Sequence, residues 1–169
     1  PLERIPQNLK NAIIAIEDTN FYVHHGIDFW GIGRAMITNI QQGRLAQGAS
    51  TITQQLARNA FLTLNKTFYR KIQEAYLAVQ FERLYTKSEI LEMYLNEIFL
   101  GHSAYGVETA SQQYFGKHVW ELDLAESALI AGLPQSPNNY SPLNNPERAI
   151  RRRNVVLDRM HELGYITAQ

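Results

Sequence analysis

The sequence of 169 residues contains no cysteine. This absence excludes a disulfide framework, cysteine-ligated zinc and a thiol nucleophile, although it does not decide the compartment in which the protein works. Net charge is also lacking, because sixteen basic and sixteen acidic residues cancel. Nucleic-acid binding is therefore not expected, and any anion site must come from a local cluster of cations.

Long hydrophobic runs are missing as well. No apolar stretch approaches the roughly 18 to 20 residues that span a bilayer, and no signal peptide is recognisable. We expect residues 1–169 to form a single domain with one core. We also expect this domain to be excised from a larger protein whose membrane anchor lies outside this sequence.

Strand-like alternation is almost absent, whereas apolar residues recur with helical spacing, which predicts an all-α fold. The segment between Pro134 and Pro146 contains four prolines and four asparagines and is expected to be irregular. The predicted helices run from Pro6 to Glu17, Phe29 to about Gln42, Thr51 to Phe61, Phe68 to about Tyr85, Lys87 to Phe99, after Gly106 to Phe115, Asp123 to about Gly132, and Pro146 to about Gly164.

Capping residues support these boundaries. Asp28 and Thr67 suit the caps of the second and fourth helices, and Gly43 suits the end of the second. Two pairs, Thr86 with Glu89 and Asp123 with Glu126, have the spacing of a capping box. Along the fourth helix, periodicity predicts that one apolar face is buried, consisting of Phe68, Ile72, Ala75 and Val79.

Glu17 and Asp18 follow an apolar stripe and lie at the end of the first helix. The C-terminal end of a helix carries partial negative charge, so two carboxylates there cost about 0.3 to 1 kcal/mol. Local stability does not explain this pair, which suits a catalytic base better than a structural element.

A local excess of cations surrounds Glu74, namely Arg58, Lys66, Arg70 and Lys71. Taken alone, these residues are read more readily as a solvated helix face with an Arg70–Glu74 pair worth about 0.2 to 0.5 kcal/mol. In a chain without net charge, however, such a cluster could also neutralise a phosphate or diphosphate.

The segment GASTITQQLARN places small residues, hydroxyls and amides at a junction between a loop and a helix. Ser50 and Thr51 are expected to cap that helix, and the free N–H groups there also suit an anionic or sugar ligand. The two roles are compatible.

Several kinds of site are not indicated. His24 and His25 lack a metal-ligand spacing and favour a surface or hydrogen-bonded pair, so no metal centre is expected. The sequence also lacks a GxSxG elbow, a Walker loop and a GxGxxG fingerprint, so nucleotide chemistry is not supported.

The predicted helix from Phe29 to about Gln42 is apolar on more than one side. Deep burial would explain this pattern, but together with Phe61, Leu62 and Leu64 the residues would also form a surface that dips into a membrane. The two interpretations have about equal weight.

Five stretches in this order resemble the family 51 peptidoglycan glycosyltransferases, found in class A penicillin-binding proteins and monofunctional transglycosylases. The stretches are EDTNFYVHHGID, GASTITQQLARN, RKIQEAYLAVQFE, KSEILEMYLNEIFLGHSAYGVETASQQYFGK and LAESALIAGLPQSPNNYSPLNNPERAIRRRNVVLDRM. The resemblance implies a lysozyme-like, all-α domain with a membrane-facing apolar subregion. It also implies a location on the outer face of the bacterial cytoplasmic membrane.

The implied reaction joins lipid II to a growing glycan strand through β-1,4 bonds, with inversion and release of undecaprenyl diphosphate. The resemblance assigns catalytic roles to Glu17 and Glu74. Ala49 stands where the family usually has glycine, and Arg58 where lysine is common. The positions that would contact the substrate are Asp18, Ser50, Gln55, Arg58, Lys66, Arg70 and Lys71.

In the expected mechanism, Glu17 takes the proton from the acceptor 4-hydroxyl, helped by Asp18 and partial burial. The cations stabilise the departing diphosphate, and Glu74 orients them or assists departure. No cofactor is required, although a divalent cation such as Mg²⁺ could act at the diphosphate. A transpeptidase domain in the same protein and inhibition by moenomycin would fit this family.

Two alternatives remain open. A lysozyme-like lytic enzyme, which cleaves peptidoglycan with a single acid, explains Glu17 and the helical fold but gives the cation cluster no purpose. A non-catalytic helical module that binds membranes or proteins would not depend on Glu17.

Overall fold

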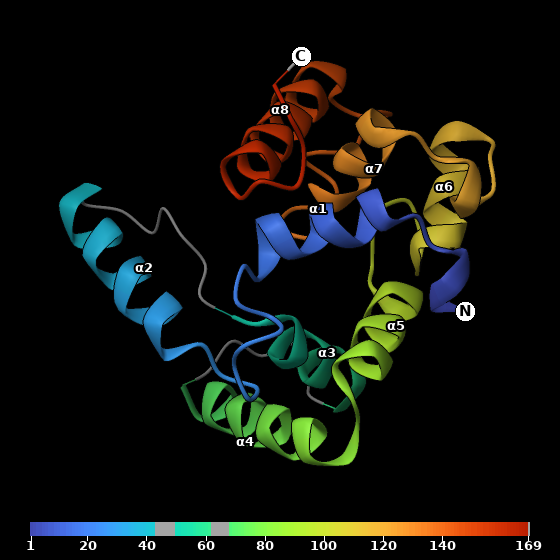
Figure 1. Ribbon diagram of the computed structural model, residues 1–169. Helices are drawn as coiled ribbons and strands as arrows, with labels where there is room; N and C mark the ends of the chain where they lie inside the picture. The colour runs from blue at the N-terminus through green and yellow to red at the C-terminus, as the bar shows by residue number, and fades with distance from the viewer. Residues whose placement is uncertain (43–49, 62–67, 169) are drawn as a thin grey trace. The chain divides into compact units, whose positions relative to one another are not determined.

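The computed structural model describes residues 1–42, 50–61 and 68–168. Every regular element in these ranges is helical, which confirms the predicted all-α class (Figure 1). An isolated bridge joins Phe99 and Tyr105. The elements are η1 (Leu2–Arg4), α1 (Gln7–Glu17), α2 (Phe29–Gln42), α3 (Ile52–Phe61), α4 (Phe68–Leu84), α5 (Lys87–Glu97), α6 (Val107–Phe115), η2 (Val119–Glu121), α7 (Leu124–Ala131) and α8 (Pro146–Glu162).

The chain divides into two compact units, which we describe separately. The first unit comprises Pro1–Thr19 and Leu91–Gln169, and the second comprises Asn20–Ile90. The expectation of a single domain over residues 1–169 stays a prediction.

The core of the first unit lies where α1 packs against α7 and α8. Leu9 and Ile13 of α1 have no exposed surface, and neither have Val156 and Met160 of α8. α7 is short and apolar, and it also packs against α6 and α8. Burial of these side chains, each worth about 1.5 to 3 kcal/mol for a Leu, Ile, Val or Met, fixes α1 and therefore the position of its last residue.

Predicted helix ends in the first unit are largely confirmed. Asp123 accepts a hydrogen bond from the Glu126 N–H at 2.8 Å, and the Glu126 side chain accepts one from the Asp123 N–H at 3.0 Å, which completes the capping box. Gly116 ends α6 with a φ of 65°, a left-handed conformation that favours glycine. Pro6 precedes α1 as its N-cap instead of opening the helix, because its ψ of 142° is extended.

Caps also define the helices of the second unit, in which α3 packs against α4. Asp28 Oδ1 accepts a hydrogen bond from the Gly31 N–H at 3.0 Å and caps α2, as predicted. Thr51 is the cap of α3, which therefore begins at Ile52: its hydroxyl accepts from the Gln54 N–H at 3.1 Å. The predicted end at Gly43 and the predicted cap Thr67 lie outside the described residues.

The burial predicted for α4 is wrong. Phe68 is 83% exposed and Ile72 is 54% exposed, whereas Ala75 and Val79 are half-buried. The buried residues of this helix are Arg70, Glu74 and Ala78. Periodicity separates the apolar and polar faces of a helix, but packing decides which face is covered, and here the polar face lies against the rest of the unit.

α2 exposes its apolar residues too, so the interpretation of deep burial is wrong for this helix. Phe29, Trp30 and Ile40 are 75%, 84% and 78% exposed, whereas Ala35 is buried. Leu62 and Leu64, expected to join the same surface, lie outside the described residues, as does the side chain of Phe61. None of the described helices combines the length and apolar character needed to cross a membrane.

Candidate active site

Glu17 is the last residue of α1 and is half-buried, and Asp18 follows it as the C-cap. The Asp18 N–H donates to the Ile14 carbonyl at 3.1 Å, and the residue is only 5% exposed. The prediction that the first helix ends in Glu17 is confirmed. Since α1 is held by its buried apolar face, the two carboxylates have a rigid support.

The segment after these acids is tied to α8. Arg159 Nη2 donates a hydrogen bond to the Thr19 hydroxyl at 3.3 Å, and Arg159 Nη1 pairs with Glu162 at 3.0 Å. The contact between Arg159 and Thr19 joins residues 140 positions apart. It holds the chain in place just beyond Glu17 and Asp18.

In the second unit, Lys71 lies between a hydroxyl and a carboxylate. Its Nζ donates to Ser50 Oγ at 2.6 Å and to Glu74 Oε1 at 3.1 Å. The Lys71 side chain is 47% exposed, whereas that of Glu74 has no exposed surface. This arrangement keeps one ammonium group fixed and still accessible to a ligand.

The buried carboxylate of Glu74 lowers the stability of the fold, because one of its oxygens is unsatisfied within the described part of the chain. Its Oε2 is buried and receives no hydrogen bond from any residue that the structure describes. An unsatisfied buried acceptor costs about 1 to 3 kcal/mol, and more when the group is charged. The carboxylate is therefore explained better by the orientation of Lys71 than by stability.

Two further predicted residues join this cluster. Gln55 Nε2 donates to the Ser50 carbonyl at 3.4 Å. Arg70 is 7% exposed and lies four residues before Glu74, on the same buried face of α4. Because Arg70 and Glu74 are buried and only Lys71 of this face is exposed, the interpretation of the whole face as solvated is wrong.

Among the described residues of the second unit, Arg58 makes no hydrogen bond or ion pair with Lys71 or Glu74. Arg58 is half-buried on α3, one turn after Gln55, and Lys66 lies outside the described residues. Glu17 and Asp18 belong to the first unit, whereas Ser50, Lys71 and Glu74 belong to the second.

Sequence reasoning missed a partly buried polar network in the second unit. Glu82 Oε1 accepts from Lys87 Nζ at 2.6 Å and from the Thr53 hydroxyl at 2.8 Å. Lys87 Nζ also lies 3.4 Å from Nδ1 of His24, which accepts a hydrogen bond from the Gly26 N–H. His24 is thus hydrogen-bonded, as expected, whereas the network itself joins residues too distant in sequence for any local pattern to predict it.

Gly26 brings this loop close to the Glu74 helix. Its φ of 105° favours glycine, and a Cβ at this position would lie 2.9 Å from the backbone of Ala78 on α4. The Thr51 hydroxyl donates to the Gly26 carbonyl at 2.7 Å. The loop therefore contacts α4 through its backbone and α3 through the Thr51 side chain, which follows Ser50 in the sequence.

The described residues do not group three or more His, Asp or Glu side chains in a way that could hold a metal ion. Around Glu74 they supply one carboxylate, and its Oε1 already pairs with Lys71. Hard divalent cations prefer several oxygen ligands, so this donor set does not form a protein-built metal site.

Comparison with known proteins identifies the family to which the chain belongs. A sequence model described as Transglycosylase matches residues 1–161. The chain is 56% identical to penicillin-binding protein 1A of Aquifex aeolicus, 55% to that of Escherichia coli K12, and 46% to penicillin-binding protein 1F of Bacillus subtilis. Each alignment covers 99% of this chain but only 23%, 20% and 24% of the respective relative.

Among solved structures, the crystal structure of penicillin-binding protein 1A from Haemophilus influenzae is 54% identical to this chain. The match covers 49% of this chain and 12% of that one, with a TM-score of 0.48. Since the family model matches almost the whole chain, and relatives are more than half identical to it, the chain belongs to the transglycosylase family.

Proposed function

We propose that this chain is a peptidoglycan glycosyltransferase domain that joins lipid II units into β-1,4-linked glycan strands. The reaction inverts the donor sugar and releases undecaprenyl diphosphate. The observation that carries the proposal is the Lys71 ammonium, held between Ser50 Oγ at 2.6 Å and buried Glu74 at 3.1 Å. Family membership gives the reaction class, and the fixed, accessible cation suits a diphosphate leaving group.

Glu17 is the general base in this proposal. It takes the proton from the acceptor 4-hydroxyl as that oxygen attacks the donor sugar. Its half-buried position at the end of a well-packed helix supports this role, because a base must be held within hydrogen-bond reach of the proton. The buried Asp18 beside it orients the acceptor.

Positive charge stabilises the departing diphosphate. Lys71, Arg70, Arg58 and Lys66 supply that charge, and Glu74 orients Lys71. Fixed charges aimed at a developing negative charge often make the largest contribution to catalysis. Ser50 and Gln55 contact the phosphate or the sugar from the start of α3. No second carboxylic acid is needed at the leaving oxygen, because a neutralised diphosphate leaves readily.

A divalent cation such as Mg²⁺ at the diphosphate stays a prediction. The cationic surroundings of Glu74 do not fit a protein-built site, so the proposal derives no catalytic step from such an ion. Its contribution would be measured by comparing turnover in a chelator with turnover in added Mg²⁺.

Exposed apolar residues support a membrane location for the reaction. Trp30 of α2 and Phe68 of α4 are 84% and 83% exposed, and similar residues surround them on these helices. Large exposed apolar surfaces mark contacts with partners or membranes. We place this surface at the outer face of the bacterial cytoplasmic membrane, where a lipid-linked substrate resides. A transmembrane anchor and a transpeptidase domain belong to the longer protein in this proposal.

Product analysis tests the function. Purified chain is incubated with lipid II in one reaction and with finished peptidoglycan in another, and both products are separated by size. Strand growth from lipid II that is blocked by moenomycin is the expected result. Anhydro-sugar or reducing-end products from finished peptidoglycan would indicate a lytic enzyme, and absence of any turnover would indicate a binding module.

A further inference from the structure

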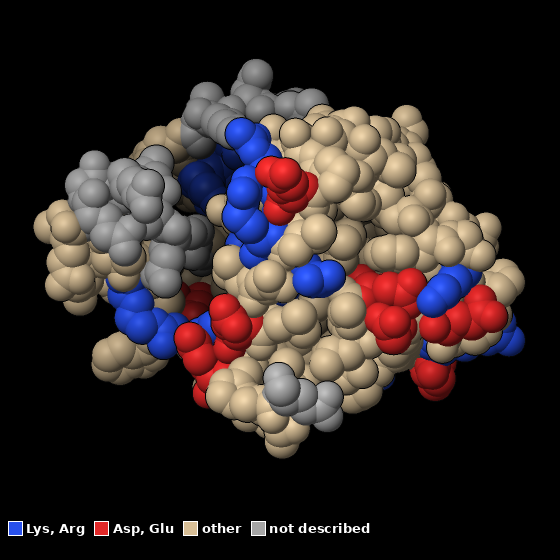
Figure 2. All heavy atoms as spheres, turned by 90° about the horizontal axis from the view of Figure 1, so that it is seen from above, with Lys and Arg blue, Asp and Glu red and all other residues tan. Residues whose placement is uncertain are grey.

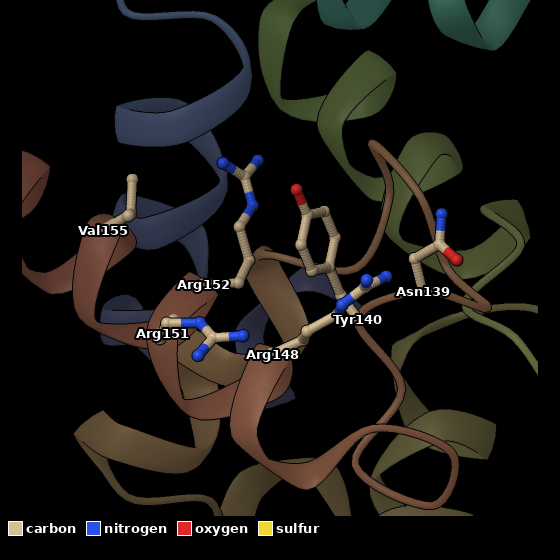
Figure 3. Close-up of a pocket in the computed structure, with 6 residues that line it drawn as sticks. All are labelled: Asn139, Tyr140, Arg148, Arg151, Arg152 and Val155. Atoms are coloured by element: carbon tan, nitrogen blue, oxygen red, sulfur yellow. The ribbon is translucent and has the colours of Figure 1, made fainter.

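A second basic site lies in the first unit, on the N-terminal half of α8. A pocket of about 350 Å³ is formed by this helix and the segment that precedes it. Figure 3 shows the side chains of Arg148, Arg151 and Arg152 extending from α8, with the Arg152 guanidinium beside the Tyr140 ring. The lining residues are Asn139, Tyr140, Arg148, Arg151, Arg152 and Val155.

These three arginines are not neutralised by the protein. Within the described ranges, no carboxylate forms an ion pair with Arg148, Arg151 or Arg152, whereas Arg159 on the same helix pairs with Glu162. The view from above shows a group of basic side chains with an acidic side chain next to it (Figure 2). Three guanidinium groups around one pocket suit an anion that carries more than one charge.

Helix stability does not explain the arrangement. Arg148 lies in the first turn of α8 and the other two lie in the second, near the end of the helix that carries partial positive charge. Cations at that end are unfavourable, typically by about 0.3 to 1 kcal/mol. Glu147 in the first turn offsets part of this cost, whereas Asn145, the N-cap, makes no side-chain hydrogen bond.

Two contacts within the protein hold the Arg152 guanidinium in place at the pocket. Its Nε donates to the Gly132 carbonyl at 3.1 Å, and its guanidinium lies 5.2 Å from the centre of the Tyr140 ring. Both contacts leave the two Nη groups without an acceptor among the described residues. A planar fork of donors held in this way matches phosphate oxygens.

Gly132 provides space for this arginine. A Cβ at position 132 would lie 2.7 Å from Cγ of Arg152, which is part of the stem of the side chain. The backbone of Gly132 is right-handed helical, with a φ of −77°, so its conformation does not require glycine. Close passage of the Arg152 stem is therefore the physical reason for a residue without a side chain.

We propose that this pocket binds a phosphate or diphosphate group. Its volume is at the lower end of the range of about 300 to 1,000 Å³ for ligand sites, which suits a small polyanion. The amide of Asn139 and the hydroxyl of Tyr140 add polar groups at the rim. This site differs in residues and in unit from the Lys71 cluster, so it does not depend on the proposed function.

The test follows arginine Nε–Hε signals by NMR while inorganic diphosphate is added to the 169-residue chain. The expected result is saturable shifts at Arg148, Arg151 and Arg152, with little change at Arg153, which bonds Asn154 and does not line the pocket. Equal shifts at Arg153, or no saturable shifts at the three arginines, would overturn the proposal.

Variants keep the test independent of folding. Combining R148Q with R151Q, both at exposed positions, should weaken binding at the Arg152 signal at least about tenfold, because two charge-assisted contacts are lost. Gly132→Ala should weaken it as well by displacing Arg152, and R153Q should not. Circular dichroism confirms that each variant is folded, and unchanged affinity in the folded double variant would contradict the assignment.

Two further arms identify the source of the phosphate. Lipid II in detergent micelles, compared with empty micelles, tests a lipid-linked diphosphate, and phosphatidylglycerol vesicles test a membrane surface. Shifts with both inorganic diphosphate and lipid II would support the site with a lipid-linked ligand. Shifts with inorganic diphosphate alone would support it with a soluble ligand. Shifts with vesicles alone would overturn it in favour of membrane contact.

Discussion

α1 and α4 each carry a candidate catalytic glutamate, but α1 buries its apolar face whereas α4 buries its polar face. α1 buries Leu9 and Ile13 and presents Glu17 at its end. α4 buries Arg70 and Glu74 and exposes Phe68. Burial of its hydrophobic face stabilises α1, whereas α4 leaves Phe68 exposed and gains no stability from burying it.

The difference indicates two kinds of positioning. A carboxylate at the end of a helix lies beyond the buried apolar face, so it does not need polar partners inside the core. A carboxylate in the middle of a helix must be surrounded by polar partners, as Glu74 is by Lys71 and the neighbouring Arg70. In α4, function and burial therefore compete for the same face, and the exposed apolar residues are left for a partner or membrane.

Removing the base at the end of α1 should have the largest effect. Glu17→Gln keeps size and removes proton acceptance, so glycan synthesis from lipid II should fall by at least about 10² to 10⁴. Thermal unfolding should change little, since Glu17 is outside the apolar contact. The exposed Glu3 of η1 offers a control, because Glu3→Gln should leave synthesis unchanged. Near-normal synthesis by the Glu17 variant would remove it from the mechanism.

Breaking the buried contact on α4 should have the next largest effect. Lys71→Gln should lower the rate of strand synthesis by about 10² to 10³, the range found when one preorganised charge or donor is lost. Glu74→Gln should lower it less, because Lys71 remains but is poorly oriented. Rates on lipid II at saturating concentration would measure both.

Arg70 is a less suitable position for this comparison. Because it is 7% exposed, Arg70→Ala should destabilise the fold as well as slow turnover. Unchanged rates in the Lys71 variant would show that the fixed ammonium has no catalytic role.

The two apolar faces should differ in stability. Ile13→Ala on α1 should lower the free energy of unfolding by about 2 to 5 kcal/mol, since the side chain is fully buried. Ile72→Ala on α4 should change it by less than about 0.5 kcal/mol, because that side chain is 54% exposed. Urea unfolding followed by circular dichroism would measure both, and similar losses at the two positions would refute the contrast between the faces.

The smallest effect is expected at Glu108, whose carboxylate accepts hydrogen bonds that stabilise the fold. It serves as a structural control for the candidate catalytic residues Glu17 and Glu74. Burial alone would raise the pKa of Glu108, but hydrogen bonds from the Val119 N–H, Gln112 and His118 outweigh it and lower the pKa below 4.5. A lowered pKa in the folded state stabilises the protein above the unfolded pKa, and this stabilisation is lost as pH falls through the folded pKa.

Glu108→Gln should therefore be less stable than the parent chain at pH 7, and the gap should close as pH falls below about 4. Solvent screening at this partly exposed side chain limits the gap to a few tenths of a kcal/mol. Unfolding measured at pH 7 and pH 3 would test the sign, and an equal gap at both values would contradict it.

Local patterns predicted most helix boundaries correctly. Asp28 and the Asp123–Glu126 box cap helices as expected, because each cap depends on atoms within three residues. Glu17 was placed at the end of its helix because it follows an apolar stripe with helical spacing. The wrong predictions concern which face of a helix is buried. Periodicity identified the apolar stripe from Phe68 to Val79, but it could not show that Phe68 and Ile72 face solvent.

The site required contacts between distant residues. Ser50 and Lys71 are 21 positions apart, and His24 and Lys87 are 63 apart, so neither pair follows from spacing. In α8, the run of arginines was visible in the sequence, whereas the pocket depends on Gly132 and Tyr140 meeting Arg152.

The amino-acid sequence by itself determined the helical class, the positions of the helix ends and the types of residue available for chemistry. These properties follow from local hydrogen bonding and periodicity, which act over a few residues. Only the tertiary structure decided which face of α4 is covered, which cation contacts Glu74 and where α8 forms its pocket. Those outcomes depend on burial and on partners that are distant along the chain, and chain folding alone brings them together.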